Sequence, residues 1–337
     1  MGRPLYSEPR FFLHKTHNLA AGVKQGQLRA LAKAITLIES RNADHSPAAA
    51  ALLEELLPAS GKAMRIGISG VPGVGKSTFI EAFGLRLTRL GHKVAVLAVD
   101  PSSQISGGSI LGDKTRMEEL ARDPNAFIRP SPAGGTLGGV ARKTRETMLL
   151  CEAAGYDVVI VETVGVGQSE ITVASMVDFF LLLQLPGAGD ELQGIKKGVM
   201  EIADAILINK AEGDNRPRAE LARGQYVNAL HLLKPKSDHW PVPALLCSAL
   251  HGEGIAEVWE TIQAFRRAME TSGEFAEKRR RQAVDWMWTL VMDDLKQLFL
   301  HDPKVEALLP RLQDAVDQGI TTPGVAARRL LEAFRRP

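Results

Sequence analysis

Short apolar runs alternate with stretches of helical periodicity through the middle of this chain, from Met64 to about Phe265. Runs of this kind, rich in Val, Ile and Leu, are typical of strands that are buried on both faces of a parallel sheet. The helical stretches between them would supply the crossovers that parallel strands require. The pattern therefore predicts an α/β fold in which helices flank a mostly parallel sheet. The expected strands cover residues 64–69, 93–99, 126–129, 157–161, 178–185, 204–208 and 242–247.

The two ends of the chain carry helical patterns without strand signals. Residues 18–57 place apolar side chains at helical spacing, with an interruption at 42–47, so two helices are expected ahead of the sheet. After Phe265 the spacing is again helical. About seventy residues of helix make only a thin core. The segment around Trp286 and Trp288 is therefore expected to be buried in a homodimer interface.

A glycine-rich loop follows the first expected strand and matches the phosphate-binding pattern GxxxxGK[ST]. Its glycines let backbone N–H groups turn inward around a β-phosphate, which would also lie at the positive end of the next helix. Lys76 is expected to reach the β- and γ-phosphates, and Ser77 to ligate Mg²⁺. The sequence thus predicts a site for a nucleoside triphosphate. Its residues are Gly70, Val71, Pro72, Gly73, Val74, Gly75, Lys76, Ser77 and Thr78.

Further carboxylates are expected near the phosphates. Glu162 follows the expected strand at 157–161, and a carboxylate at the carboxyl end of such a strand lies beside the phosphate loop. Gly165 leaves room for the γ-phosphate to contact a backbone N–H group. Asp100 and Asp113 would bring two more carboxylates toward the metal. The predicted Mg²⁺ ligands are Ser77, Asp100, Asp113 and Glu162.

A second strand ends in a near match to the guanine-reading pattern Asn-Lys-x-Asp. An aspartate in the last place accepts hydrogen bonds from guanine N1 and N2, which adenine cannot donate. Here that place holds Glu212, with Asp214 two residues on, and the sequence leaves open which of them reads the base. Downstream, a Ser-Ala-Leu segment resembles the loop whose backbone N–H contacts the guanine oxygen. The predicted base-reading residues are Asn209, Lys210, Glu212, Ser248, Ala249 and Leu250.

Together with the runs at 99–103, 106–117 and 162–170, these motifs closely resemble the MeaB/ArgK family of cofactor-chaperone GTPases. The family comprises bacterial relatives of the human methylmalonic aciduria type A protein, and the resemblance extends from about residue 10 to the C-terminus. It implies a GTPase chaperone for an adenosylcobalamin-dependent acyl-CoA mutase. Such a chaperone gates delivery of intact cofactor, removes inactivated cofactor and protects the mutase during turnover. The family pattern has aspartate where this chain has Glu212.

The pattern along the chain indicates a domain plan, and the resemblance implies two switch segments. In the family, segments that correspond to 104–117 and 190–197 respond to the nucleotide, and the second transmits the presence of the mutase. Lys196 is expected to swing over the phosphates, so the predicted catalytic residues are Lys76, Asp100, Glu162 and Lys196. The expected domains are an N-terminal helical segment (1–60), a P-loop GTPase domain (61–265) and a C-terminal helical dimerisation arm (266–337).

Composition is consistent with a soluble enzyme. The chain has 337 residues, of which 45% are apolar and 24% charged, enough to bury a full core. A formal net charge of +2 is too small to indicate binding to nucleic acid or to an anionic membrane. The basic run at 278–281 is expected to be a solvated helix face. Cys151 and Cys247 are expected to be core thiols. With neither an apolar membrane span nor a signal-peptide core, the expected location is cytoplasmic.

Two other functions remain open from the sequence. A metallochaperone GTPase that loads nickel or zinc would need clusters of Cys and His, and His14 and His17 are the one such pair. An ATP-dependent protein kinase, as the older ArgK label suggests, would release phosphorylated protein instead of free phosphate. The identity of the client is also open. It is methylmalonyl-CoA mutase or a related isobutyryl- or hydroxyisobutyryl-CoA enzyme.

Overall fold

The computed structural model of the chain describes residues 9–40, 42–99, 117–130, 137–163, 169–187 and 197–335. In this part of the chain, seven strands form one sheet in the order β3-β2-β4-β1-β5-β6-β7, and every neighbouring pair is parallel. The predicted α/β fold is confirmed, and each strand begins at or just after its predicted start. The strands are β1 (Met64–Gly70), β2 (Val94–Val99), β3 (Ala126–Arg129), β4 (Val158–Thr163), β5 (Phe179–Gln184), β6 (Ala205–Ile208) and β7 (Ala244–Leu246).

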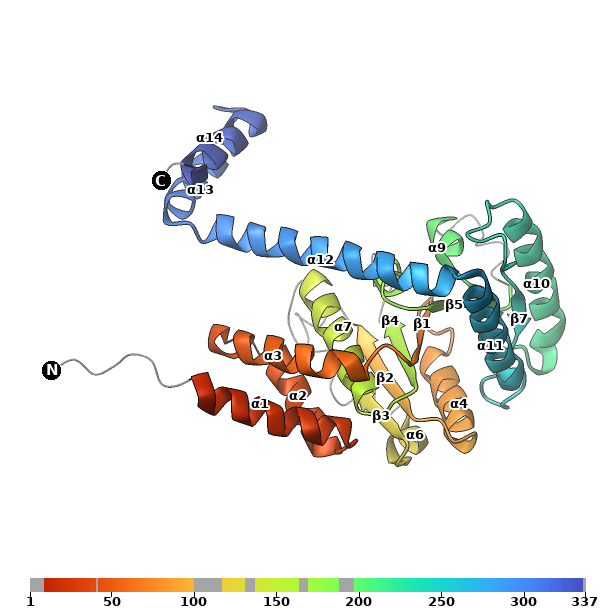
Figure 1. Cartoon of the computed structure of the whole chain (residues 1–337). Helices are drawn as coiled ribbons and strands as arrows, with labels where there is room; N and C mark the ends of the chain where they lie inside the picture. The colour runs from red at the N-terminus through yellow and green to blue at the C-terminus, as the bar shows by residue number, and fades with distance from the viewer. Residues whose placement is uncertain are drawn as a thin grey trace. The chain divides into compact units, whose positions relative to one another are not determined.

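Helices cover both faces of this sheet (Figure 1), because successive strand residues point to opposite faces and most of them are apolar. On one face, Ile66 and Ile68 of β1 share a core with α4 (Lys76–Arg89), α6 (Glu118–Arg122) and α11 (Ile255–Ser272). On the other face, Val159 and Val161 of β4 share a core with α7 (Leu137–Ala153), α8 (Ser169–Ala174), α9 (Lys197–Ile202) and α10 (Arg216–His231). Each buried Val, Leu or Ile side chain stabilises the fold by roughly 1.5–3 kcal/mol. This two-sided core holds the strand ends in place.

The N-terminal region forms one more helix than the sequence predicts. The helices are α1 (Pro9–Lys24), α2 (Leu28–Glu39) and α3 (Ser46–Leu56). The additional break lies at Gly26, whose φ of 71° is a left-handed conformation that ends a helix and favours glycine. Both α2 and α3 pack against α7. Glu39 fastens α2 to the sheet region, because its carboxylate pairs with Arg129 and its carbonyl oxygen accepts a hydrogen bond from Lys143 Nζ at 2.6 Å.

The described chain divides into two compact units, Met1–Phe275 and Ala276–Pro337. The second unit contains most of α12 (Glu274–Leu300) together with α13 (Pro303–Asp317) and α14 (Pro323–Arg335). Within it, α13 packs against α14, and the rings of Phe299 and Phe334 meet edge to face at 5.4 Å. The three-part domain plan given above stays a prediction.

The two cysteines lie in the core as predicted. Cys151 and Cys247 are both buried and free, and burial raises the pKa of each thiol, so both are protonated at neutral pH. Among the helices that the structure describes, none combines the length and the apolar character that crossing a membrane requires.

Candidate nucleotide-binding site

The predicted phosphate loop connects the end of β1 to the start of α4, as the sequence pattern requires. Gly75 is the residue before α4 and has a φ of 89°, a conformation that favours glycine. A Cβ atom at Gly75 would lie only 2.8 Å from Asn209 Nδ2, so a side chain is excluded by contact as well. The glycine therefore lets the loop close against the strand that carries the base-reading motif.

Lys76 is held inside this loop. Its Nζ donates hydrogen bonds to the carbonyl oxygens of Gly70, at 2.8 Å, and Val71, at 3.4 Å. Burial lowers the pKa of Lys76, while the negative charges of Glu162 and Glu170 act in the opposite direction. The ammonium group is thus partly desolvated without a ligand, which strengthens its attraction for phosphate oxygens.

Glu162 lies where the sequence predicts, next to the phosphate loop. In the pairing of β1 with β4, Glu162 stands opposite Ile68, and both Glu162 and Thr163 are buried. The hydroxyl of Thr163 donates a hydrogen bond to Ser69 Oγ at 2.8 Å, which fixes the ends of the two strands together. The carboxylate is therefore presented at the carboxyl ends of the strands, where ligands bind in open parallel sheets.

Asn209 joins the three segments that would surround a nucleotide. Its Nδ2 donates a hydrogen bond to the carbonyl oxygen of Val74 in the phosphate loop, at 2.8 Å. Its Oδ1 accepts one from the backbone N–H of Ala249 in the Ser-Ala-Leu loop, at 3.1 Å. Both bonds are buried, so Asn209 connects the phosphate loop to the loop expected to contact the base.

Lys210 adopts a strained backbone conformation. Its φ is 59°, and among the described residues it is the one non-glycine residue with positive φ. Such a conformation costs on the order of 1–3 kcal/mol and is concentrated at functional sites. Its side chain is exposed beside the buried Asn209. A lysine held in this way is suited to lie over the face of a bound base.

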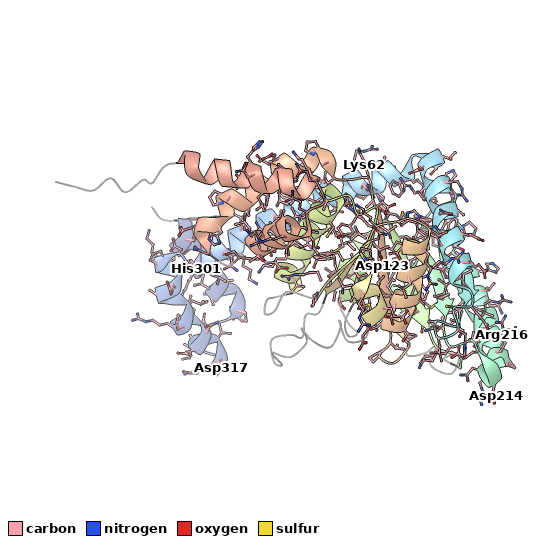
Figure 2. The ribbon with its side chains drawn as sticks, turned by 90° about the horizontal axis from the view of Figure 1, so that it is seen from below. Lys62, Asp123, Asp214, Arg216, His301 and Asp317 are labelled. Atoms are coloured by element: carbon pink, nitrogen blue, oxygen red, sulfur yellow. The ribbon has the colours of Figure 1, made fainter. Side chains whose placement is uncertain are left out.

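The two candidate base readers differ in their surroundings. The Oε2 atom of Glu212 is buried and has no hydrogen-bond partner in the described part of the chain. Asp214, in contrast, is exposed, and Figure 2 shows it at the surface next to Arg216. Leaving a buried acceptor unpaired costs roughly 1–3 kcal/mol. The geometry therefore favours Glu212 as the carboxylate that receives hydrogen bonds from a ligand.

Several predicted residues lie outside the described part of the chain. These are Asp100, Asp113, Gly165 and Lys196. Among the described residues, no group of three or more His, Cys, Asp and Glu side chains is arranged to hold a metal, and His17 pairs with Glu55 at 3.0 Å. Sequence reasoning did not single out Glu170, a buried carboxylate of α8 whose charge acts on Lys76. Its place at the end of the distinctive run 165–170 was the available signal.

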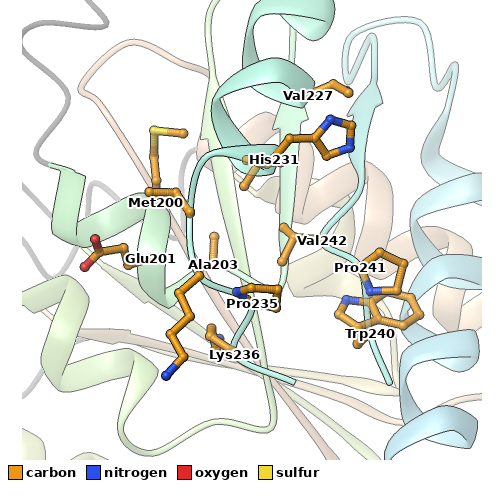
Figure 3. Close-up of a pocket in the computed structure, with 13 residues that line it drawn as sticks. Met200, Glu201, Ala203, Val227, His231, Pro235, Lys236, Trp240, Pro241 and Val242 are labelled. Carbon is orange, nitrogen blue, oxygen red and sulfur yellow. The ribbon is translucent and has the colours of Figure 1, made fainter. Parts of the chain in front are cut away.

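A separate pocket of about 260 Å³ lies among α9, α10 and the segment that leads to β7 (Figure 3). Its wall includes Ala203 and Val242, which precede β6 and β7. Nearby, Asp204 accepts a hydrogen bond from Lys236 Nζ at 2.6 Å and one from Trp240 Nε1, to its backbone oxygen, at 2.8 Å. This pocket is at the amino-terminal ends of the strands and so does not belong to the nucleotide site.

The parallel sheet, the phosphate loop and the base-reading segment define a P-loop GTPase. The sequence profile of the family described as "Methylmalonyl Co-A mutase-associated GTPase MeaB" matches residues 31–304. The chain belongs to this MeaB family, as the resemblance implied.

Relatives support the same assignment. GTPase ArgK of Escherichia coli is 50% identical over 310 residues, which cover 92% of this chain and 94% of ArgK. The protein named methylmalonic aciduria type A homolog, mitochondrial, of Mus musculus is 49% identical over 327 residues, covering 94% of this chain and 79% of the relative. A crystal structure described as LAO/AO transport system kinase matches with a TM-score of 0.77 and 41% identity, and covers 99% of this chain and 100% of that one.

Proposed function

We propose that this GTPase is a chaperone for an adenosylcobalamin-dependent acyl-CoA mutase, either methylmalonyl-CoA mutase or a close relative. It gates delivery of intact adenosylcobalamin, removes inactivated cofactor and protects the mutase during turnover. Membership of the MeaB family carries the proposal, because the description of that family names a mutase-associated GTPase and the match spans 31–304. The name of the Mus musculus relative supports the same client.

The proposed reaction is transfer of the γ-phosphoryl group of GTP to water. Such reactions depend on positioning and on neutralising the charge that spreads over the phosphate oxygens. Lys76 supplies one positive charge, and its hydrogen bonds to the loop carbonyls are exchanged for bonds to phosphate when GTP binds. Asn209, Lys210 and Glu212 orient the base, with Ser248, Ala249 and Leu250 closing over its edge.

The donors near the phosphates suit Mg²⁺, which prefers oxygen ligands and retains several waters. Ser77 is half-buried in the first turn of α4, and Glu162 is buried at the end of β4. We assign these two as Mg²⁺ ligands, directly or through water, together with Asp100 and Asp113. When bound, the ion supplies positive charge at the β- and γ-phosphates.

The partner is proposed to act through the segment that contains Lys196. This segment leads directly into α9, which packs against α8, the helix that carries Glu170. Binding energy from the mutase would bring Lys196 over the phosphates. By linkage, the nucleotide state would then change the affinity for the mutase. Gly165 would sense the γ-phosphate on the other side.

We expect a cobalamin-dependent acyl-CoA mutase to raise GTP turnover at least about 10-fold, which corresponds to about 1.4 kcal/mol of transition-state stabilisation. Lys196→Ala should abolish most of this acceleration while leaving basal hydrolysis nearly unchanged. Phosphate release by the purified protein, with and without the mutase, measures both effects. Lys234→Ala, which removes an exposed lysine after α10, is the matched control and should behave like the parent. Turnover that ignores every cobalamin mutase offered would refute the chaperone assignment.

A homodimer is proposed from the exposed face of α12. Val284, Trp288, Val291, Leu295 and Leu298 follow one another at alternating spacings of four and three residues, and their side chains are 53%, 58%, 38%, 49% and 62% exposed. This is the spacing of a helix seam that packs against a second helix. A continuous apolar face of this kind is unusual on a monomer, so we assign it to the dimer interface.

Replacing Trp288 and Leu295 together by glutamate should convert the dimer to a monomer, because each chain would place two charges in the apolar seam. Light scattering coupled to size exclusion gives the molar mass directly. The control is Thr289→Glu, which adds a carboxylate to another side of the same exposed helix and should leave the mass unchanged. A parent protein that is monomeric at all concentrations would disprove the assignment.

The same assays separate the other two functions. A protein kinase would transfer labelled γ-phosphate to protein, whereas the proposed GTPase releases it as free phosphate. A metallochaperone would bind nickel or zinc in stoichiometric amounts, which equilibrium dialysis measures. The kinase test is included because the solved relative at 41% identity is described as a transport system kinase.

A further inference from the structure

A second cavity, of about 330 Å³, lies at the end of the sheet opposite to the nucleotide site. Its wall includes Met64 and Val158, the first residues of β1 and β4, whereas the phosphate loop follows the last residue of β1. One side of α11 forms the remainder, including Arg266 and Arg267. The volume is within the range of small-molecule sites. The cavity lies entirely within the first compact unit.

The carboxylates of this cavity are already engaged in hydrogen bonds with their neighbours. Asp157 Oδ2 lies 2.6 Å from His92 Nδ1, and Oδ1 accepts a hydrogen bond from the backbone N–H of Lys93 at 2.7 Å. Glu270 accepts a hydrogen bond from Arg266 Nε at 2.7 Å. Within the described part of the chain, neither carboxylate therefore forms an ion pair with Lys62 or Arg267.

Two cations of the cavity are left without a counter-charge. Lys62 and Arg267 are exposed, and neither side chain has a hydrogen-bond or ion-pair partner in the described part of the chain. Figure 2 shows Lys62 at the surface of the protein. Arg266 is held in place by Glu270 and by the ring of Phe275, which lies 5.9 Å from its guanidinium carbon. The cavity thus combines one fixed guanidinium with two free cations.

The structure assigns to this cavity a small phosphate-bearing ligand, bound by Lys62, Arg266 and Arg267. Guanidinium groups present parallel donors that match the oxygens of a phosphate, and lysine adds a compact charge. Trp259 and Ile262, which are 8% and 1% exposed, supply an apolar part of the cavity wall. The phosphate can be inorganic or the terminal group of an organic ester. This site depends neither on GTP nor on the mutase.

The test is isothermal titration of the whole protein with two probes, inorganic pyrophosphate and phenyl phosphate. An excess of GDP keeps the phosphate loop occupied, and low ionic strength preserves the attraction between exposed charges. Each probe should bind once per chain to the parent. Lys62→Ala combined with Arg267→Ala should weaken binding at least about 10-fold, since each charge-assisted bond contributes about that much. Lys33→Ala combined with Arg218→Ala removes the same charge from exposed positions outside the cavity and should leave binding unchanged.

The two probes also distinguish the sources of the phosphate. Tighter binding of phenyl phosphate would identify an organic ester whose body lies against Trp259, whereas tighter binding of pyrophosphate would identify an inorganic or terminal diphosphate. The single variant Arg267→Ala, at an exposed position, keeps the test informative if the double variant folds poorly. Absence of binding to the GDP-saturated parent, or equal binding by parent and cavity variants, would overturn the assignment.

Discussion

Lys76→Ala is expected to weaken GTP binding by at least about 100-fold, or about 2.7 kcal/mol. The ammonium group is already partly buried among the loop carbonyls, so binding GTP costs less further desolvation of the lysine. Its attraction for the phosphates is lost completely with the side chain. Titration of the nucleotide-free protein with a non-hydrolysable GTP analogue measures the change.

The matched contrast is Glu162→Ala. This carboxylate is assigned to the metal and the reaction, so its removal should lower turnover more than nucleotide affinity. Measuring both quantities for both variants separates a binding role from a chemical role. If both variants bind and hydrolyse GTP like the parent, the site has been misplaced.

GDP should bind at least about 100-fold more tightly than ADP, again about 2.7 kcal/mol. The unpaired Oε2 of Glu212 is the physical reason, because guanine N1 and N2 can donate to it and adenine offers an acceptor at the corresponding edge. Calorimetric titration with the two nucleotides gives the ratio. Comparable affinities would show that a glutamate in this place has abolished guanine reading.

Three substitutions locate the source of this discrimination. Glu212→Asp should change it only a few-fold, because both carboxylates can accept the same pair of bonds. Glu212→Ala should remove most of it, whereas Asp214→Ala, at an exposed position, should leave it intact. Loss of discrimination in Asp214→Ala with retention in Glu212→Ala would transfer the role to the aspartate.

Much of the fold could be predicted because its signals are local. Each strand is a short apolar run with a turn at its end. The helical stretches between these runs indicate that the strands pair in parallel. The break at Gly26 was missed, because a glycine inside a helical pattern is often tolerated and its left-handed φ depends on how α1 and α2 pack.

The candidate site was predicted by residue type but not by arrangement. In the structure Lys76 begins α4 directly after the phosphate loop, Glu162 lies near the end of β4 and Asn209 follows β6, and the glycine loop and the strand periodicity are what located these positions in the sequence. The choice between Glu212 and Asp214 could not be made from sequence, because it depends on which side chain is buried. The strained backbone of Lys210 is likewise a property of the folded chain.

The two hydrogen bonds of Asn209 limit how this protein's nucleotide preference can be changed. The side-chain amide of Asn209 links the phosphate loop to the Ser-Ala-Leu loop. Replacing it therefore lowers the affinity for every nucleotide, whatever its base. Substitution of Asn209 is therefore a poor route to a new base specificity, because the variants would bind all nucleotides weakly. The accessible route to another base starts at Glu212. Its buried Oε2 accepts no hydrogen bond from the described part of the chain, so this residue can vary while the phosphate site stays intact.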